Sequence, residues 1–238
     1  MPQMSNDPRV AASRQTAGQS VPVPQLGGTG RVADDMYLMA HNDLSGKPYL
    51  QPRALGLGLA GGLLAELMLA GRIDARPGEI VVAEGAPRVG DDLARHVLGL
   101  VLSEREPLAV AEWLLFLART AAGDVARRLA TSGYLARAGE RRRWGGKRWV
   151  PVDADCAFGP LVRVRPALAR SRHLTLYGAC LAGLADACGL GPRMFAYAPP
   201  NATRRYLDEV VARLDPGLRY LIAQTQAAVG SAVLSQRV

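Results

Sequence analysis

Arginine and tryptophan residues gather in one stretch of this sequence, from Arg119 to Arg148, and these are its clearest candidates for binding chemistry. The stretch holds nine cations against two anions, whereas the formal net charge of the whole chain is +8. Only Lys47 and Lys147 are lysines, so the charge is carried by arginine, which suits bidentate contacts to phosphate. A GC-rich genome, which favours arginine codons, would explain that preference equally well. Because the rest of the chain is close to neutral, the sequence predicts one docking surface for a polyanion.

The centre of the basic stretch is expected to form a β-hairpin, because Gly145-Gly146 suits a two-residue turn. This turn would set three pairs across the strands: Trp144 with Lys147, Arg143 with Arg148, and Arg142 with Trp149. Since side chains alternate along a strand, one face would carry Arg142, Trp144, Lys147 and Trp149, and the other would carry Arg141, Arg143, Arg148 and Val150. Cations and indoles would then alternate on the first face, where cation–π contacts add stability.

Such a hairpin fits more than one kind of surface. Exposed tryptophans beside cations are typical of proteins that dock on anionic membranes, where the indole lies at the level of the headgroups. The same features are typical of a DNA-binding wing, whose cations contact phosphates. A third alternative is a solvated hairpin whose tryptophans pack back on the body of the protein.

Residues that usually carry catalysis or bind metals are scattered along the chain. The histidines (His41, His96 and His173) lack metal-binding spacing, and the cysteines (Cys156, Cys180 and Cys188) include no CxxC pair. Cys180 and Cys188 fall in an apolar helical segment, which favours buried thiols. The sequence contains no Walker A or GxSxG motif. We therefore expect a protein that is not an enzyme and has no metal or cofactor.

One segment, Gly56-Leu57-Gly58-Leu59-Ala60-Gly61, matches the GxGxxG pattern of dinucleotide-binding proteins. That fingerprint needs a buried strand directly before the first glycine and a βαβ unit around it. Pro52 argues against such a strand, and the remaining chain does not alternate strands with helices. We interpret these glycines as small residues that let another helix pack closely.

Apolar residues recur at helical spacing from Val32 onward, which predicts a mainly α fold. Helices are expected at residues 36–42, 55–69, 91–102, 107–118, 121–132, 161–170, 174–188 and 202–214, with a last one from Gly217. One short strand pair is expected between residues 72–74 and 79–82, around a turn at Pro77-Gly78, and Asn201 and Gly189 are an expected N-cap and helix stop. The prediction is a single-domain helical bundle over residues 32–238, with a projecting basic β-hairpin and this strand pair.

Composition and the ends of the chain exclude other classes of protein. Hydrophobic residues make up 49% of the chain, which indicates a folded body. Residues 1–31 are rich in Pro, Gly, Ser and Gln, and we expect them to form a flexible tail. The apolar run 54–71 contains Glu66 and is too interrupted for a membrane span. Since the N-terminus lacks the apolar core of a signal peptide, the expected location is the cytoplasm.

Several segments, taken together in their order, resemble the Golgi phosphoprotein 3 family of phosphoinositide-binding peripheral membrane proteins. They are MYLMAHND at 36–43, GLAGGLLAELMLAGRI at 58–73, EWLL at 112–115, RRL at 127–129 and SGYL at 132–135. The LAEL…GRI run is the most specific of them. The resemblance covers the chain from Val32 to the C-terminus, and the alanine- and arginine-rich composition is typical of a bacterial member.

The resemblance implies a mostly helical domain, no enzymatic activity, and binding of phosphatidylinositol 4-phosphate at a membrane. In eukaryotic members a tryptophan and an arginine near the start of the long helix, and two arginines on a later helix, hold the headgroup. An ungapped placement puts these four positions on Gln51, Ala60, Arg119 and Ala122. Only Arg119 is retained, and Arg53, Arg127 and Arg128 are the candidates to replace the missing cations.

We therefore expect a cytoplasmic, peripherally membrane-associated protein that binds anionic lipid headgroups. The headgroup-binding candidates are Arg53, Arg119, Arg127 and Arg128, and the membrane-facing hairpin residues are Arg141, Arg142, Arg143, Trp144, Lys147, Arg148 and Trp149. The alternative is a nucleic-acid-binding protein in which the helix 121–132 and the hairpin form a winged helix-turn-helix. An adaptor that binds other proteins through residues 1–31 is a third hypothesis. The sequence leaves the oligomeric state and the identity of the anion open.

Overall fold

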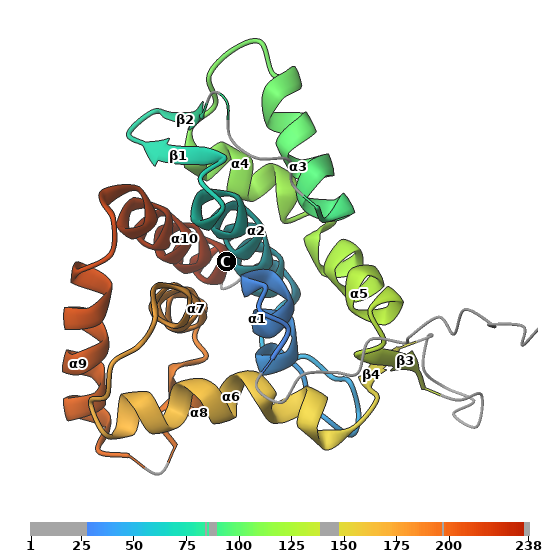
Figure 1. The fold of residues 1–238 in the computed structure, drawn as a ribbon, viewed down its shortest axis with the longest axis vertical. Helices are drawn as coiled ribbons and strands as arrows, with labels where there is room; N and C mark the ends of the chain where they lie inside the picture. The colour runs from blue at the N-terminus through green and yellow to red at the C-terminus, as the bar shows by residue number, and fades with distance from the viewer. Residues whose placement is uncertain (1–27, 84, 86–89, 139–147, 197, 236–238) are drawn as a thin grey trace, which may run out of the picture.

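The computed structural model describes residues 28–83, 85, 90–138, 148–196 and 198–235 of the chain. Over these residues it contains ten α-helices and two antiparallel strand pairs, which confirms the expected mainly α fold (Figure 1). The helices are α1 (Val32–Ala40), α2 (Pro52–Leu69), α3 (Asp92–Ser103), α4 (Val110–Leu117), α5 (Ala121–Thr131), α6 (Ala154–Ala169), α7 (Leu176–Ala187), α8 (Gly191–Met194), α9 (Pro200–Ala212) and α10 (Pro216–Leu234). The strands are β1 (Ile73–Arg76), β2 (Glu79–Val82), β3 (Leu135–Arg137) and β4 (Trp149–Pro151).

Helix α2 lies at the centre of the fold, and helices α1, α4, α5, α7 and α10 pack around it (Figure 1). Every residue of α2 between Ala54 and Ala65 is buried. By length and composition alone, α2 is apolar enough to cross a membrane. Because its neighbours bury most of its length, we interpret it as the core helix of the bundle, as its apolar pattern predicts.

The glycines of α2 let other helices approach its backbone closely. A Cβ built on Gly62 would lie 2.8 Å from the Cα of Ala33 in α1, and a Cβ on Gly56 would lie 2.5 Å from the carbonyl oxygen of Ala118 after α4. Gly61 faces helix α10 in the same way. The interpretation of the GxGxxG match as helix packing is therefore confirmed.

Most predicted helices are present, and most of their starts differ from the prediction by up to four residues (α1 begins at Val32 and α2 at Pro52, earlier than predicted, and α4 begins at Val110, later than predicted). Three further differences concern caps or a missed helix. Helix α6 begins at Ala154 rather than residue 161, because the carboxylate of Asp153 accepts a hydrogen bond from the Cys156 amide and caps the helix. Helix α9 begins at Pro200, whose fixed φ suits the first helical position. Asn201 therefore lies inside its first turn and is not the N-cap. The short helix α8 was not predicted.

The two strand pairs are both antiparallel hairpin arms. Strand β1 pairs with β2 so that Ile73 lies opposite Val82, around the expected Pro77-Gly78 turn. Strand β3 pairs with β4 so that Leu135 lies opposite Pro151 and Arg137 opposite Trp149.

The β3–β4 register corrects the predicted basic hairpin. Trp149 lies opposite Arg137 rather than Arg142, and the amide of Ala138 donates to the carbonyl of Arg148, which was expected to face Arg143. A two-residue turn at Gly145-Gly146 would have placed Arg142 opposite Trp149. The observed partner, Arg137, lies five residues earlier in the sequence. The prediction was wrong because the strand begins directly after α5, at Leu135, where the chain is pinned to the core. The predicted tip residues Arg141, Arg142, Arg143, Trp144 and Lys147 lie outside the described residues.

Close packing at the α2 glycines predicts opposite effects for two Gly→Ala substitutions. Gly62→Ala should destabilise the protein by about 1–3 kcal/mol, because the methyl group meets the backbone of Ala33, which cannot rotate away. Gly99→Ala, on an exposed face of α3 with open space at its Cβ position, should stabilise it by roughly 0.5–1 kcal/mol. Urea unfolding of the two variants measures both values. Equal shifts in the same direction would contradict the packing argument.

Candidate anion-binding surface

Exposed arginines follow one side of the molecule, along the turn after α4, helix α5 and the β3–β4 pair. These elements succeed one another down the right side of Figure 1. Arg119 lies in the turn, Arg127 on α5, Arg137 in β3 and Arg148 directly before β4, and all four are exposed. Within the described part of the chain, neither Arg119 nor Arg148 has a carboxylate partner. Their positive charge is therefore available to a bound anion.

Arg119 stands at the edge of an apolar cavity of about 300 Å³ between α3 and the α4–α5 corner. The cavity is lined by Leu63, Leu93, His96, Val97, Leu100, Phe116, Leu117, Arg119, Thr120 and Asp124. A second cavity of about 600 Å³ continues along α5 and shares Leu93, His96 and Asp124 with the first. Arg127 and Arg31 lie along this second cavity. The structure therefore places Arg119 and Arg127 along one groove beside α3.

Arg127 forms an ion pair with Asp124, one turn earlier on α5. Both residues are on one helix face, and the Arg127 side chain is mostly exposed. Exposed pairs of this kind contribute little to stability, about 0.2–1 kcal/mol. Arg127 can therefore leave Asp124 and contact a more strongly charged group such as a phosphate instead.

Arg53 lies in the first turn of α2, apart from the groove, and its Nη1 atom is 3.4 Å from Ser235 Oγ at the end of α10. Arg53 and Arg119 lie at the same end of α2, because Gly56, about one turn after Arg53, contacts Ala118, the residue directly before Arg119. Ala60, a position assigned to a headgroup arginine by resemblance, is completely buried. Arg53 can serve the anion surface, but the residue at position 60 cannot.

The base of the basic hairpin is fixed to the body. The guanidinium carbon of Arg137 lies 4.8 Å from the centre of the Trp149 ring, which is a cation–π contact. Gly46, with φ of +61°, presses against the Trp149 carbonyl so closely that a Cβ would collide with it. Arg137 is thus the residue opposite Trp149, whereas the sequence predicted Arg142 there.

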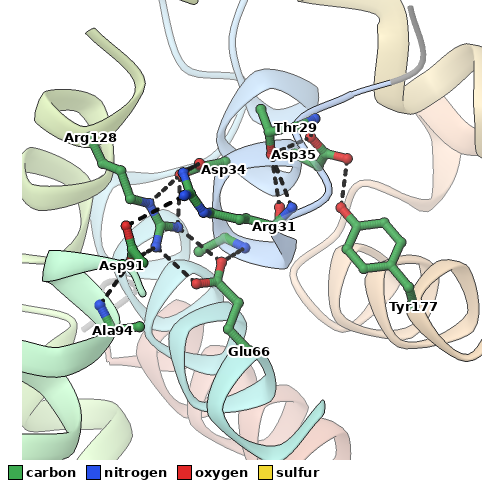
Figure 2. A network of polar contacts seen from close by, with 10 residues as sticks. Thr29, Arg31, Asp34, Asp35, Glu66, Asp91, Ala94, Arg128 and Tyr177 are labelled. Atoms are coloured by element: carbon green, nitrogen blue, oxygen red, sulfur yellow. Dashed lines mark hydrogen bonds and ion pairs between the residues drawn. The ribbon is translucent and has the colours of Figure 1, made fainter. Parts of the chain in front are cut away.

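Arg128 also lines the second cavity, together with Asp91 and Asp92, but its charge is not free to bind an anion. Its residue is only 8% exposed, and its guanidinium lies among three carboxylates from α1, α2 and the cap of α3 (Figure 2). Nε donates to Asp34 at 2.8 Å, Nη1 donates to Glu66 at 2.9 Å and Asp91 at 2.8 Å, and Nη2 donates to Glu66 at 2.9 Å. Every nitrogen of the guanidinium is therefore used inside the protein. Arg128 is left out of the binding surface for this reason.

The carboxylates around Arg128 also complete the ends of helices. Glu66 Oε1 accepts the amide hydrogen of Ala33 at 2.8 Å, which satisfies an orphan donor in the first turn of α1. Asp91 caps α3 by accepting from the Ala94 amide at 2.9 Å. One arginine on α5 thus links the starts of two helices to the last turn of α2 (Figure 2). We call Arg128, Asp34, Glu66 and Asp91 the central ion cluster.

A second buried carboxylate, Asp35, connects α1 to α7. Its Oδ2 atom accepts from the Tyr177 hydroxyl at 2.6 Å, and its Oδ1 atom accepts from the amide and the hydroxyl of Thr29 at 2.6 and 2.9 Å. Burial raises the pKa of both Asp35 and Tyr177. These contacts hold the chain in place directly before α1.

Charge in the central ion cluster is not balanced. Three carboxylates face Arg128, and Arg31 adds a more distant cation, 3.7 Å from Asp34 Oδ2. Burial raises the pKa of Asp34 to about 7, although Arg128 opposes this shift, and burial also raises the pKa of Glu66. The pKa of Asp91 is lowered against the effect of burial by the Ala94 amide and by Arg128. Asp34 and Glu66 are thus the groups of the cluster whose protonated form burial favours.

No catalytic or metal-binding group emerges from the part of the chain that the structure describes. It contains no set of three His, Cys, Asp or Glu side chains that could hold a metal ion. The three cysteines are buried, and burial raises the pKa of each thiol to about 12. Neutral thiols are poor nucleophiles.

Sequence reasoning missed the central ion cluster. One signal was present, because Glu66 is the lone acid in an apolar helix and a buried acid needs a partner. The partner could not be identified, since Glu66 and Arg128 are 62 residues apart.

The central ion cluster predicts a large difference between two neighbouring arginines. Arg128→Ala should lower the free energy of unfolding by about 3–5 kcal/mol, because it leaves three carboxylates buried without their cation. Arg127→Ala, at the next and exposed position, removes only the ion pair with Asp124 and should change it by less than about 1 kcal/mol. Urea unfolding compares the two. Similar midpoints would show that the cluster does not hold the helices together.

The raised pKa of Asp34 predicts that stability falls as the pH rises. In the unfolded chain Asp34 loses its proton near 3.8, but in the fold it keeps the proton to about 7. The fold therefore binds an extra proton between these values, and the free energy of unfolding decreases across this range and levels off above it. Asp34→Asn, which cannot titrate, should show a shallower decrease. Unfolding midpoints measured at several pH values test this, and equal slopes for both proteins would contradict it.

Comparison with known proteins identifies the family of this chain. The family model described as Golgi phosphoprotein 3 (GPP34) matches residues 32–233, which covers the described helices from α1 to nearly the end of α10. A search of curated proteins finds no match. The match spans well over half of the sequence, and on this ground the chain belongs to the Golgi phosphoprotein 3 (GPP34) family.

Proposed function

We propose that this protein is a non-catalytic peripheral membrane protein that docks on anionic lipid from the cytoplasmic side. The observation that carries this proposal is the row of exposed arginines along α5 and the β3–β4 pair, with Trp149 beside them. Arginines bind phosphate in bidentate fashion, and a tryptophan at the base of a basic hairpin suits the headgroup layer. Membership of the Golgi phosphoprotein 3 family supports a phosphoinositide-like lipid as the ligand.

The proposed binding is mainly a response to charge density. Each cation near an anionic leaflet contributes about 1 kcal/mol, so Arg119, Arg127, Arg137 and Arg148 together give useful binding without a specific pocket. Ala60 is buried and uncharged, and the position of Ala122 offers no cation. We therefore propose that the protein distinguishes anionic from neutral membranes more strongly than it distinguishes one anionic headgroup from another.

Burial of Arg128 does not favour the nucleic-acid alternative. A winged helix over residues 121–132 would use Arg127 and Arg128 on phosphates or bases, but Arg128 points into the protein. Mobility-shift titration against duplex DNA at several salt concentrations tests this alternative directly. Tight, salt-dependent DNA binding without vesicle binding would overturn our proposal.

Charge reversal on the proposed surface should abolish vesicle binding. In Arg119→Glu/Arg127→Glu, two attractions are lost and two repulsions are gained, each of about 1 kcal/mol, which weakens binding roughly 1000-fold. The matched control is Arg205→Glu/Arg213→Glu on the α9 side, which makes the same change in net charge at two exposed arginines. Co-sedimentation with vesicles of phosphatidylcholine and phosphatidylglycerol measures both. Equal losses in the two variants would show that net charge alone, and no particular surface, drives binding.

Headgroup preference is tested by a second vesicle series of matched total charge. One set contains phosphatidylinositol 4-phosphate and the other contains cardiolipin. We expect closely similar affinities, because the surface responds to charge. A strong preference for the phosphoinositide would instead support a pocket around Arg119 that selects the headgroup. Neutral vesicles, which should not bind, are the reference.

A further inference from the structure

Two large apolar side chains stand exposed on the outer face of α4, beside Arg119. Leu115 is 49% exposed and Phe116 is 47% exposed, whereas Leu114 and Leu117 are buried in the core. Arg119 follows in the turn directly after α4, where its amide donates to the carbonyl of Phe116 at 3.4 Å and its side chain lines the same cavity as Phe116. The cation thus lies beside an exposed apolar face. We call Leu115, Phe116 and Arg119 the α4 patch.

More exposed apolar surface gathers at the same end of α2. Gly56 of α2 contacts Ala118 directly before Arg119, and Arg53, one turn earlier on α2, contacts Ser235 at the end of α10. Leu234, next to Ser235, is 66% exposed. Helices α2, α4 and α10 therefore bring apolar groups and two arginines to one end of the bundle. Neither arginine has a carboxylate partner in the residues described.

This mixture of groups identifies the kind of surface that could cover the α4 patch. A protein interface would bury Arg53 and Arg119 and would have to supply carboxylates for them, since an unpaired buried charge is costly. An anionic membrane satisfies both groups at once, because the arginine stems pass through apolar surroundings while their heads reach phosphate. Leucine and phenylalanine beside cations are also the composition of surfaces that lie in the membrane interface.

We propose that Leu115 and Phe116 insert at the boundary between headgroups and acyl chains, and that Arg119 binds lipid phosphate beside them. This proposal rests on the proposed function and adds an apolar contact that does not depend on charge attraction. The two contributions respond differently to salt. Attraction between exposed charges is screened at about 1 M salt, where the Debye length is about 3 Å, whereas apolar insertion persists.

Salt dependence separates the α4 patch from the arginine row. Leu115→Ser/Phe116→Ser should bind anionic vesicles about tenfold or more weakly than the natural protein at low salt, and by a similar factor at about 1 M salt, because the apolar contribution does not depend on ionic strength, whereas the loss caused by Arg119→Glu/Arg127→Glu should shrink at about 1 M salt. The control is Val162→Ser/Leu176→Ser, which removes two similarly exposed apolar side chains from α6 and α7 and should bind as the natural protein does. Circular dichroism confirms that both variants are folded. Unchanged high-salt binding of the α4 variant overturns the proposal.

A fluorescent probe tests insertion directly. The native cysteines are buried, so a cysteine introduced by Leu115→Cys can be labelled selectively with an environment-sensitive dye, with Val162→Cys as the control position. On phosphatidylglycerol vesicles the dye at position 115 should brighten and shift to the blue, and the dye at position 162 should not. The same change at position 115 without vesicles, growing with protein concentration, would instead assign the patch to self-association and overturn the proposal.

The experiment also separates failure of this proposal from failure of the proposed function. If neither labelled protein binds vesicles at low salt, the proposed function itself fails. If both bind vesicles but the dye at position 115 is unchanged, only the insertion fails.

Discussion

The guanidinium of Arg128 is the group on which the arrangement of the N-terminal half depends. It contacts carboxylates from α1, α2 and the cap of α3, and two of these carboxylates also accept amide hydrogens at helix starts. Helices α1, α2, α3 and α5 are consequently fixed relative to one another by directional contacts, in addition to apolar packing that tolerates sliding. A buried arginine with three acids is stable only in one geometry, because every donor of the planar guanidinium has to meet an acceptor.

Close packing around α2 makes this geometry reachable. Glu66 can meet both Ala33 and Arg128 because Gly62, one turn before it, lets α1 lie directly against the α2 backbone. The apolar core and the ion cluster therefore reinforce each other. Together they form a rigid platform, and the exposed parts of the surface (the α4 patch, Arg127 on α5 and the base of the β3–β4 pair) project from it. Arg127 and Arg128 are adjacent in sequence, yet one faces the solvent and the other holds the core.

The sequence was informative wherever a local rule applied. Apolar periodicity predicted most helices, the Pro77-Gly78 turn predicted the β1–β2 pair, and Gly189 ended α7 as expected, with φ of +93°. Local rules failed where a more distant contact decided the outcome. The register of the β3–β4 pair follows from the attachment of Leu135 to the core and of Trp149 to the Gly46 turn, and a pair of glycines at a presumed turn could not reveal either contact.

The fold class could be predicted from the sequence, and so could the central position of α2, the family resemblance and the concentration of positive charge between Arg119 and Arg148, because each depends on composition or on short-range spacing. Which arginines remain exposed depends on contacts that form only in the folded chain. Arg119 and Arg127 face outward, Arg137 stacks on Trp149, and Arg128 is enclosed by Asp34, Glu66 and Asp91. All these arginines carry the same charge in the sequence. Their roles differ because burial beside distant carboxylates, which only folding brings together, converts one of four similar residues into the centre of the structure.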